Sequence, residues 1–253
     1  MDIALLTLLA GLSVFVGILV GGVGIGGVLL VPILTYILAI DIHIAIAAAM
    51  FSYMFSGIVG AVIYARQGTI QWSVAFWLLV SAAPAAFLAA FASSVIPPRG
   101  LEFFIAVLIV FAGINALRPQ GNRQLRESPL SRGALVATGT VTGVGSALSG
   151  TGGPLVLVPI LVWLRFPARV AIGLSQAIQI PIAIMATAGN YIHGTVDFVL
   201  GSVIAIGLVA GVTGGAYLAH VISQAALQRL VAWVLVAVGF FIMGRISLSL
   251  IAA

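Results

Sequence analysis

The sequence predicts an all-α polytopic membrane protein made of two homologous halves. Hydrophobic residues fill 62% of the 253 positions and charged residues only 6%, whereas roughly a quarter of a soluble domain is charged. Apolar stretches of about 17 to 25 residues, long enough to cross a bilayer, recur along the chain. Short motifs also recur at a fixed spacing. The alternating strands typical of outer-membrane barrels are absent from the sequence.

The apolar segments form two sets on either side of a hydrophilic stretch, "RPQGNRQLRESPLSR". They lie near residues 3–20, 28–40, 43–65, 73–95 and 101–117, and again near 133–149, 154–164, 168–192, 198–220 and 227–250. We therefore predict a first membrane repeat at 1–117, a polar cytoplasmic linker at 118–132 and a second repeat at 133–253. Together the repeats provide eight to ten membrane segments.

Three motifs support the duplication. "VPIL" occurs at 31–34 and at 158–161, and "GTIQW" at 68–72 answers "GTVDF" at 194–198, 126 residues later. The pair Gly26-Gly27 answers Gly152-Gly153 at the same offset. Internal repeats are typical of secondary transporters, whose substrate sites lie between the repeats. Some channels and membrane enzymes are also duplicated, so the repeat alone does not select a function.

The second segment of each half is too short to cross a membrane as a straight helix. Residues 28–40 would make about 20 Å of helix, against a hydrocarbon core of about 30 Å. In each half a glycine-rich stretch precedes this segment. We expect either a re-entrant half-helix or one arm of a broken helix after a glycine-rich turn.

The arginines indicate how often each half crosses the membrane. With five crossings and a cytoplasmic linker, eight arginines lie inside and only Arg99 and Arg245 lie outside. With four crossings the split becomes six to four. Because basic residues concentrate on the cytoplasmic side, five crossings are favoured. An odd number predicts inverted repeats.

Composition and context exclude several function classes. The net charge of +5 comes from arginines in short loops, which we interpret as orientation signals facing anionic lipid, so we expect no nucleic-acid partner. The absence of cysteine excludes disulfides and thiolate sites. Gly22 to Gly27 match GxGxxG, but a membrane-length apolar run precedes them instead of a strand in a soluble βαβ unit. We expect no cofactor and no metal site, and we interpret the N-terminus as a retained first span.

The two glycine turns are the main candidate for a binding site. The residues concerned are Gly24, Gly26 and Gly27 in the first turn and Gly150, Gly152 and Gly153 in the second. A short helix that begins just after such a turn presents free backbone N–H groups and a positive dipole end of about half a charge. Two such ends near the midplane would bind an anion without an ionised side chain. The alternative, favoured for Gly21 and Gly22, is close helix packing.

Polar side chains inside apolar segments add further candidates. Ser175, Gln176 and Gln179 share a region of one predicted helix, and the matching stretch of the first half offers Ser52, Tyr53 and Ser56. Unpaired amides are costly in hydrocarbon, so these side chains should face the bundle interior. Ser149 and Thr151, in the second turn, could donate hydroxyl protons to an oxyanion. Interhelical hydrogen bonding is the alternative role, and His43, Asn190, His193 and His220 are interpreted as structural residues near span ends.

The paired glycine turns, each followed by "VPIL" across an internal duplication, resemble the sulfite exporter (TauE/SafE-like) family of bacterial membrane transporters. The resemblance covers about residues 10 to 250. It implies a multi-pass protein of the bacterial cytoplasmic (inner) membrane that transports small sulfur-containing anions, such as sulfite, thiosulfate, sulfate or sulfonates, with protons as a possible coupling ion. The family signature maps onto Gly24, Gly26 and Gly27 with Pro32, and onto Gly150, Gly152 and Gly153 with Pro159.

The sequence therefore favours a secondary transporter for a small anion, embedded in lipid, with its oligomeric state left open. One alternative is a channel-like anion pathway. Another is an intramembrane hydrolase with Ser149 and His193 as a dyad. A coupling carboxylate is not evident, because Asp2, Asp41, Glu102, Glu127 and Asp197 fall in loops or at predicted span ends. Asp197 and His193 are the candidates for proton binding.

Overall fold

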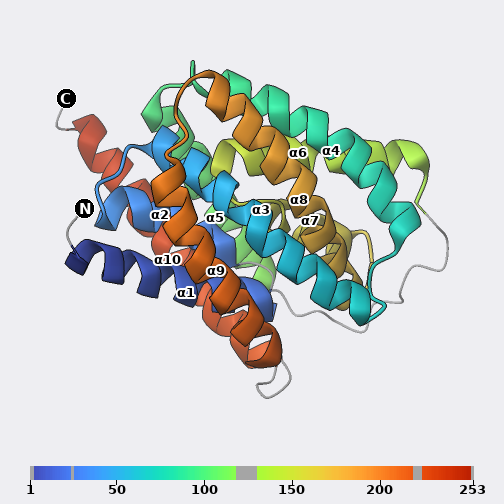
Figure 1. Cartoon of the computed structure of the whole chain (residues 1–253). Coiled ribbons are helices and arrows are strands. Elements are labelled where there is room, and N and C mark those ends of the chain that lie inside the picture. Colours follow the sequence, from blue (N-terminus) through green and yellow to red (C-terminus); the bar gives the residue numbers. More distant parts are fainter. Residues whose placement is uncertain (1–2, 24–25, 118–129, 219–223, 252–253) are drawn as a thin grey trace.

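The computed structural model describes residues 3–23, 26–117, 130–218 and 224–251, which form a helical bundle without strands in these ranges (Figure 1). The first half contains α1 (Ile3–Val23), the 3₁₀ turn η1 (Gly26–Leu29), α2 (Leu30–Pro32), the π-helical turn η2 (Ile33–Ile37), α3 (Ile42–Arg66), α4 (Trp72–Ser93) and α5 (Pro98–Leu117). The second half contains α6 (Arg132–Ser149), α7 (Pro154–Trp163), α8 (Ala168–Ile192), α9 (Phe198–Leu218) and α10 (Gln224–Ile251). The region η1–α2–η2 is called the broken segment below.

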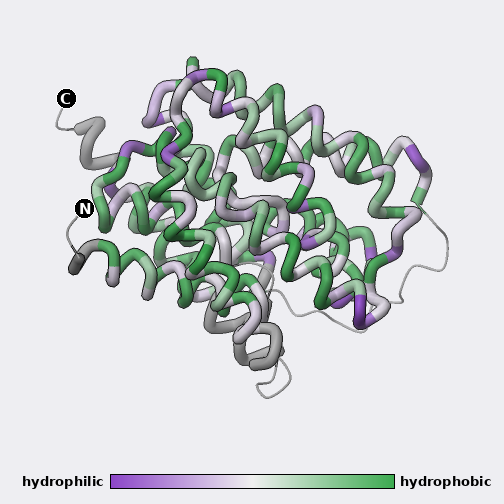
Figure 2. Tube along the Cα trace, in the orientation of Figure 1, coloured by the Kyte–Doolittle hydropathy of each residue, from purple (hydrophilic) through white to green (hydrophobic). Residues whose placement is uncertain are grey.

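Helix length and surface character match a bilayer. Within the described ranges, α3, α4, residues 98–115 of α5, α8 and residues 198–215 of α9 are long and apolar enough to cross a membrane. Large apolar side chains such as Trp72 and Ile206 are 65% and 73% exposed, which suits contact with lipid rather than water. Figure 2 shows hydrophilic residues mostly near the helix ends. The predicted all-α polytopic membrane fold is confirmed.

The two halves contain the same local structures 126 residues apart. Both α3 and α8 have 25 residues, and they begin at Ile42 and Ala168. The turns that follow them contain Gly68 and Gly194, with φ of 67° and 70°, in the left-handed region that favours glycine. Next in each turn, a threonine hydroxyl donates to the carbonyl five residues earlier, in both cases at 2.9 Å. Thus the spacing seen in the sequence motifs extends to backbone geometry.

Equivalent helices run in opposite directions. Where α3 packs against α8, the Gln179 amide donates to the Tyr53 carbonyl, whereas Gln176 lies against Gly60. Residue numbers therefore rise along one helix as they fall along the other. This is the arrangement of inverted repeats. Because Tyr53 and Gln179 are themselves 126 residues apart and touch, the pseudo-two-fold axis passes between them.

The last helices of the two halves repeat this antiparallel relation. Gly113 of α5 packs against Val236 of α10, and Ile105 near the start of α5 lines a pocket with Ile242 near the end of α10. The first helices pack differently, because α1 lies against α9 and α6 against α4. The first helix of each half therefore packs against the fourth segment of the other half, α9 or α4. The two halves are interlocked rather than simply adjacent.

The first two segments of each half form a hairpin that enters and leaves the bundle at one end. In the second half, α6 begins beside α4, where the Arg132 guanidinium lies 5.3 Å from the centre of the Trp77 ring. After α7, the chain re-emerges at the same end, because a Cβ on Gly173 of α8 would lie 2.8 Å from Thr69 Oγ1. Between them the glycine turn reaches Tyr53, midway along α3.

Each half therefore combines a hairpin with three long helices, instead of five separate crossings. Each half thus crosses the membrane an odd number of times, three instead of five. An odd number of crossings per half still predicts inverted repeats. Among the described residues, Arg66, Arg132, Arg165 and Arg169 lie at one end of the long helices, and Arg99 and Arg245 lie at the other. The positive-inside rule predicts that the first end is the cytoplasmic one.

Close approach of backbones explains the glycines of α1 and α9. A Cβ on Gly17 would lie 2.6 Å from the Leu208 carbonyl oxygen, and one on Gly211 would overlap the Val14 carbonyl oxygen. Gly21 packs against Val212 in the same way, which confirms the packing role predicted for it. Small residues at such positions let van der Waals contact hold membrane helices together.

A pair of substitutions on α9 tests this packing. We expect Gly211→Ala to push α1 from α9 and destabilise the protein by about 1–3 kcal/mol, because the added methyl meets backbone that cannot move aside. Gly214→Ala is the matched control, since no atom lies within 4 Å of a Cβ placed there. Thermal unfolding in detergent should show a lower melting temperature for the first variant alone. Equal melting temperatures would contradict the packing argument.

Candidate functional site

The glycine turns of the two halves meet beside Tyr53, at the pseudo-two-fold axis. The Tyr53 hydroxyl donates to the Gly27 carbonyl oxygen at 2.6 Å. A Cβ on Gly27 would lie 2.8 Å from that hydroxyl oxygen and 3.3 Å from the Thr151 carbonyl oxygen. A Cβ on Gly152 would lie 3.0 Å from the Tyr53 ring carbon Cγ. The two turns, separated by about half the chain, are thus in direct contact around one tyrosine.

The second turn keeps a backbone conformation that only glycine adopts readily. Gly150, Gly152 and Gly153 have φ values of 66°, 75° and 125°. The N–H groups of Gly150 and Thr151 both donate to the Ser146 carbonyl and so close helix α6. The next two N–H groups, of Gly152 and Gly153, have no hydrogen-bond partner among the described residues. They precede Pro154, the first residue of α7, where a proline costs no hydrogen bond.

The hydroxyls of the second turn are already committed. Ser149 Oγ donates to the Gly145 carbonyl at 2.6 Å and lies 2.8 Å from Thr151 Oγ1. Because Ser149 donates its only hydroxyl proton to the Gly145 carbonyl, it must accept the hydrogen bond from the Thr151 hydroxyl. Ser52 and Ser175 likewise donate to carbonyls of their own helices, each at 2.7 Å. In this conformation these four hydroxyls can accept hydrogen bonds but have no spare proton for an oxyanion.

The two glutamines of α8 differ in what they offer. Gln179 Nε2 donates to the Tyr53 carbonyl at 3.1 Å and to Ser56 Oγ at 3.2 Å, so it ties α8 to α3. Gln176 is fully buried, yet neither its amide nitrogen nor its oxygen has a hydrogen-bond partner in the described part of the chain. An unsatisfied buried amide costs roughly 1–3 kcal/mol. Gln176 therefore supplies free N–H donors inside the bundle, which a ligand can satisfy.

Ser146 is a further polar residue that the sequence analysis did not single out. Its side chain is fully buried, and its hydroxyl has no partner among the described residues. It lies one turn before Ser149 on α6, in "GVGSALSG". The three-residue spacing from Ser149 was the signal that could have found it, because residues three apart share a helix face.

Other predicted residues have packing roles or lie elsewhere. Gly26 packs on α1, where a Cβ would lie 2.8 Å from the Val20 backbone nitrogen, and Gly150 packs against Val31 and Ile46. Gly24 lies outside the described residues, as does His220. Of the candidates, Gly27, Gly152 and Gln179 all contact Tyr53.

The predicted alternatives from titratable groups find no support in the geometry. The His193 ring packs against Phe91, 4.6 Å between ring centres, and is not among the hydrogen-bond partners of Ser149, so the structure forms no Ser–His dyad. Asp197 caps α9 by accepting the Leu200 N–H at 2.9 Å. His43 contacts the Ile96 carbonyl at 3.2 Å and Asp41 at 3.4 Å.

Neutral donors dominate the region where the turns meet. This region contains the N-terminal end of α7 and the two glycine N–H groups, and the Gln176 amide lies on α8, which packs against α7. The chain from Ser146 to Trp163 contains no charged residue. The positive helix end favours an anion by electrostatics alone. Gln176, Ser149 and Thr151 are at most 2% exposed, so this conformation is closed to solvent.

Comparisons with known proteins point the same way. Residues 9–242 match the family described as Sulfite exporter TauE/SafE. A "Probable membrane transporter protein" of Bacillus subtilis is 26% identical over 221 residues, covering 84% of this chain and 89% of its own length. One from Xylella fastidiosa is 25% identical over the full length of both chains. One from Methanocaldococcus jannaschii is 25% identical, covering 93% and 96%. No solved structure matches.

The unequal bonding of the two glutamines predicts opposite effects on stability. Gln176→Leu removes an unpaired buried amide and should leave the melting temperature unchanged or raise it. Gln179→Leu removes two hydrogen bonds between α8 and α3 and should destabilise the protein by about 1–2 kcal/mol. Thermal unfolding of both variants in the same detergent checks the order. A larger loss for Gln176→Leu would mean that its amide is bonded after all.

Proposed function

The chain belongs to the TauE/SafE sulfite exporter family of membrane transporters, and from this premise we propose that it is a secondary transporter for a small sulfur-containing anion. Candidate substrates are sulfite, thiosulfate, sulfate and organosulfonates. In this proposal the protein lies in the cytoplasmic membrane of a bacterium, surrounded by lipid. Its repeats, 1–117 and 133–253, are joined on the cytoplasmic side by the linker 118–132.

One observation carries the proposal: buried backbone N–H groups without a partner among the described residues lie at the start of α7, where two inverted hairpins meet. Among the described residues, the buried N–H groups of Gly152 and Gly153 have no hydrogen-bond partner, and the same is true of the buried Gln176 amide on the neighbouring helix α8. Buried donors are normally satisfied. Donors left unpaired beside a positive helix end favour an anionic ligand, and a tetrahedral or pyramidal oxyanion presents several acceptors at once. Such a ligand would remove the unpaired groups.

The inverted architecture provides the means of transport. The α6–α7 hairpin enters from the cytoplasmic end, and the α1–broken segment hairpin enters from the opposite end. With the substrate held on the pseudo-two-fold axis, each hairpin blocks access from its own side. If the two halves exchange conformations, the same site opens first to one side and then to the other. No covalent step and no cofactor is required for this cycle.

The closed site favours a transporter over a channel. A channel-like pathway needs a continuous opening, whereas the residues around both glycine turns are buried. A transporter that alternates between sides must pass through an occluded conformation of this kind. Saturable flux that shows counterflow would support the transporter, and flux that rises without saturation would support the channel.

The test is uptake of radiolabelled sulfite, thiosulfate and sulfate into proteoliposomes. We expect saturable uptake of at least one of these anions by the wild type, and a loss of ten-fold or more in Gln176→Leu, which removes the free amide. The control Gly214→Ala, on the exposed face of α9, should transport normally. Equal uptake by the wild type and Gln176→Leu would exclude this amide from the anion site. No uptake of any sulfur oxyanion by the wild type would refute the proposed substrate class.

A further inference from the structure

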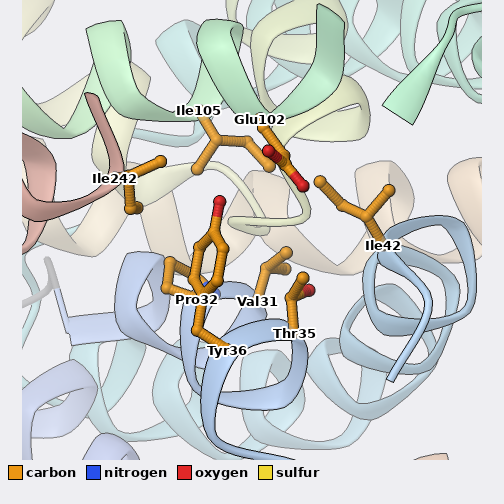
Figure 3. Close-up of a pocket in the computed structure, with 8 residues that line it drawn as sticks. All are labelled: Val31, Pro32, Thr35, Tyr36, Ile42, Glu102, Ile105 and Ile242. Carbon is orange, nitrogen blue, oxygen red and sulfur yellow. The ribbon is translucent and has the colours of Figure 1, made fainter. Parts of the chain in front are cut away.

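A second polar cluster lies at the end of the bundle opposite the cytoplasmic arginines. It lines a small pocket between the broken segment, the starts of α3 and α5, and α10 (Figure 3). The polar side chains in the pocket are Thr35, Tyr36 and Glu102, and apolar residues form the remainder of the lining. The Arg245 guanidinium of α10 lies 5.4 Å from the centre of the Tyr36 ring. None of these residues belongs to the anion site described above.

Glu102 differs from the other acids in the described chain. It is the fifth residue of α5, inside the 98–115 stretch that is apolar enough to span a membrane, and its side chain is half-buried against Ile105. Asp41 and Asp197 instead cap helix N-termini by accepting backbone N–H groups. An ionisable residue inside a membrane segment is costly and is commonly retained for a functional reason, proton relay among them.

The groups that face Glu102 leave its charge only partly compensated. Tyr36 extends its hydroxyl toward the carboxylate (Figure 3), yet that hydroxyl and Thr35 Oγ1 make no hydrogen bond of good geometry among the described residues. The Arg245 guanidinium stacks on the Tyr36 ring and is too far from the Glu102 carboxylate to form a salt bridge with it. The carboxylate therefore has two buried hydroxyls and one guanidinium nearby, without a fixed partner.

Other charges on the helices around α5 do not reach this pocket. On α5 itself, Arg99 lies one turn before Glu102 and is exposed. At the start of α3, His43 is engaged with the Ile96 carbonyl and Asp41. Helix α7 carries no titratable residue, and Arg132 of α6 stacks on Trp77 at the other end of the bundle. Protonation of Glu102 would thus change the charge of this pocket from balanced to positive.

The broken segment links this pocket to the anion site. Val31 lines the pocket, and the same side chain meets Gly150 of the second glycine turn, with Cγ2 as the atom nearest to a Cβ built there. Four residues before Val31, Gly27 accepts the Tyr53 hydroxyl at the axis. The backbone of the broken segment forms a 3₁₀ turn before Pro32 and a π-helical turn after it, rather than one regular helix. Such a segment can shift more easily than a regular helix.

We propose that Glu102 is the proton-binding site of the transporter and that its protonation is linked to the position of the broken segment. The proposal rests on the proposed transport function. Glu102 takes up one proton from the non-cytoplasmic side to become a neutral acid, which removes the negative charge that faces Tyr36 and leaves the positive charge of Arg245 uncompensated. The broken segment then moves relative to Gly150 and opens the pocket toward the other side, where Glu102 gives its proton to water before the segment returns. No bond other than the O–H bond forms or breaks.

The second half does not duplicate this cluster, which supports a separate role for it. The position 126 residues after Glu102 is Gln228, which cannot ionise, and α7, the counterpart of the broken segment, contains neither tyrosine nor threonine. If the cluster only stabilised the fold of each repeat, an acidic residue beside a tyrosine would be expected at the other end as well. Its presence in one half gives the symmetric scaffold a direction.

The test compares two kinds of flux for wild type, Glu102→Gln and the control Asp41→Asn in proteoliposomes. One assay measures counterflow exchange of the transported sulfur oxyanion at equal pH on both sides. The other measures accumulation driven by an imposed pH gradient, with proton movement followed by a pH-sensitive dye inside the vesicles. We expect Glu102→Gln to keep exchange within about three-fold of the wild type but to lose accumulation and the dye response. Asp41→Asn should keep both.

The remaining outcomes are also decisive. Accumulation and a dye response in Glu102→Gln equal to those of the wild type would overturn the proposal. So would a wild type that exchanges the anion but shows no response to the pH gradient, and this result would leave the proposed transport function intact. Loss of both exchange and accumulation in Glu102→Gln, with an unchanged melting temperature, would place Glu102 in anion passage itself and not in proton binding. No exchange by the wild type would refute the transport function instead.

Discussion

Irregular backbone inside a membrane protein must find hydrogen-bond partners, and the rest of this structure depends on how the two glycine turns find theirs. In the first turn the Gly27 carbonyl is satisfied by the Tyr53 hydroxyl. In the second turn the N–H groups of Gly150 and Thr151 both use the Ser146 carbonyl. Hydrocarbon offers nothing in exchange, so each turn must be buried in protein. The long helices α3 and α8 cross where they can enclose both turns, and this fixes the packing of the bundle.

The position of the pseudo-two-fold axis explains why the centre of the protein is chemically unequal. Residues on such an axis touch their own equivalents, as Tyr53 and Gln179 do through a 3.1 Å hydrogen bond. Two identical residues at this position would each need the same side-chain contact, and the space on the axis holds only one such side chain. With a tyrosine on one side, a hydroxyl reaches the first glycine turn; with a glutamine on the other, an amide reaches α3. The symmetric fold therefore carries an asymmetric site.

Much of the fold could be predicted from the sequence, because it depends on local patterns. The length of the apolar run predicts the bounds of α8, and the glycines followed by proline predict the start of α7 at Pro154. The distribution of arginines predicts an odd number of crossings in each half. The bonding of the hydroxyls could not be predicted, since serine and threonine in a helix can donate to their own backbone, as Ser149 does to Gly145. Glu102 was assigned to a span end, because only the packing of α10 and η2 against α5 shows that it lines a pocket.

A site made of neutral donors suits a protein that must release its ligand on the far side. An arginine buried beside the anion would gain charge attraction, but it would remain as an unpaired buried charge after the anion left, at a cost of several kcal/mol. Backbone N–H groups and an amide carry only partial charges, so the empty site is tolerated, as the unpaired Gln176 shows. Passage requires binding strong enough to attract the ion and weak enough to let it go. The full charges instead stand apart, at the helix ends and in the Glu102 pocket, where they can orient the protein and bias its movement without trapping the substrate.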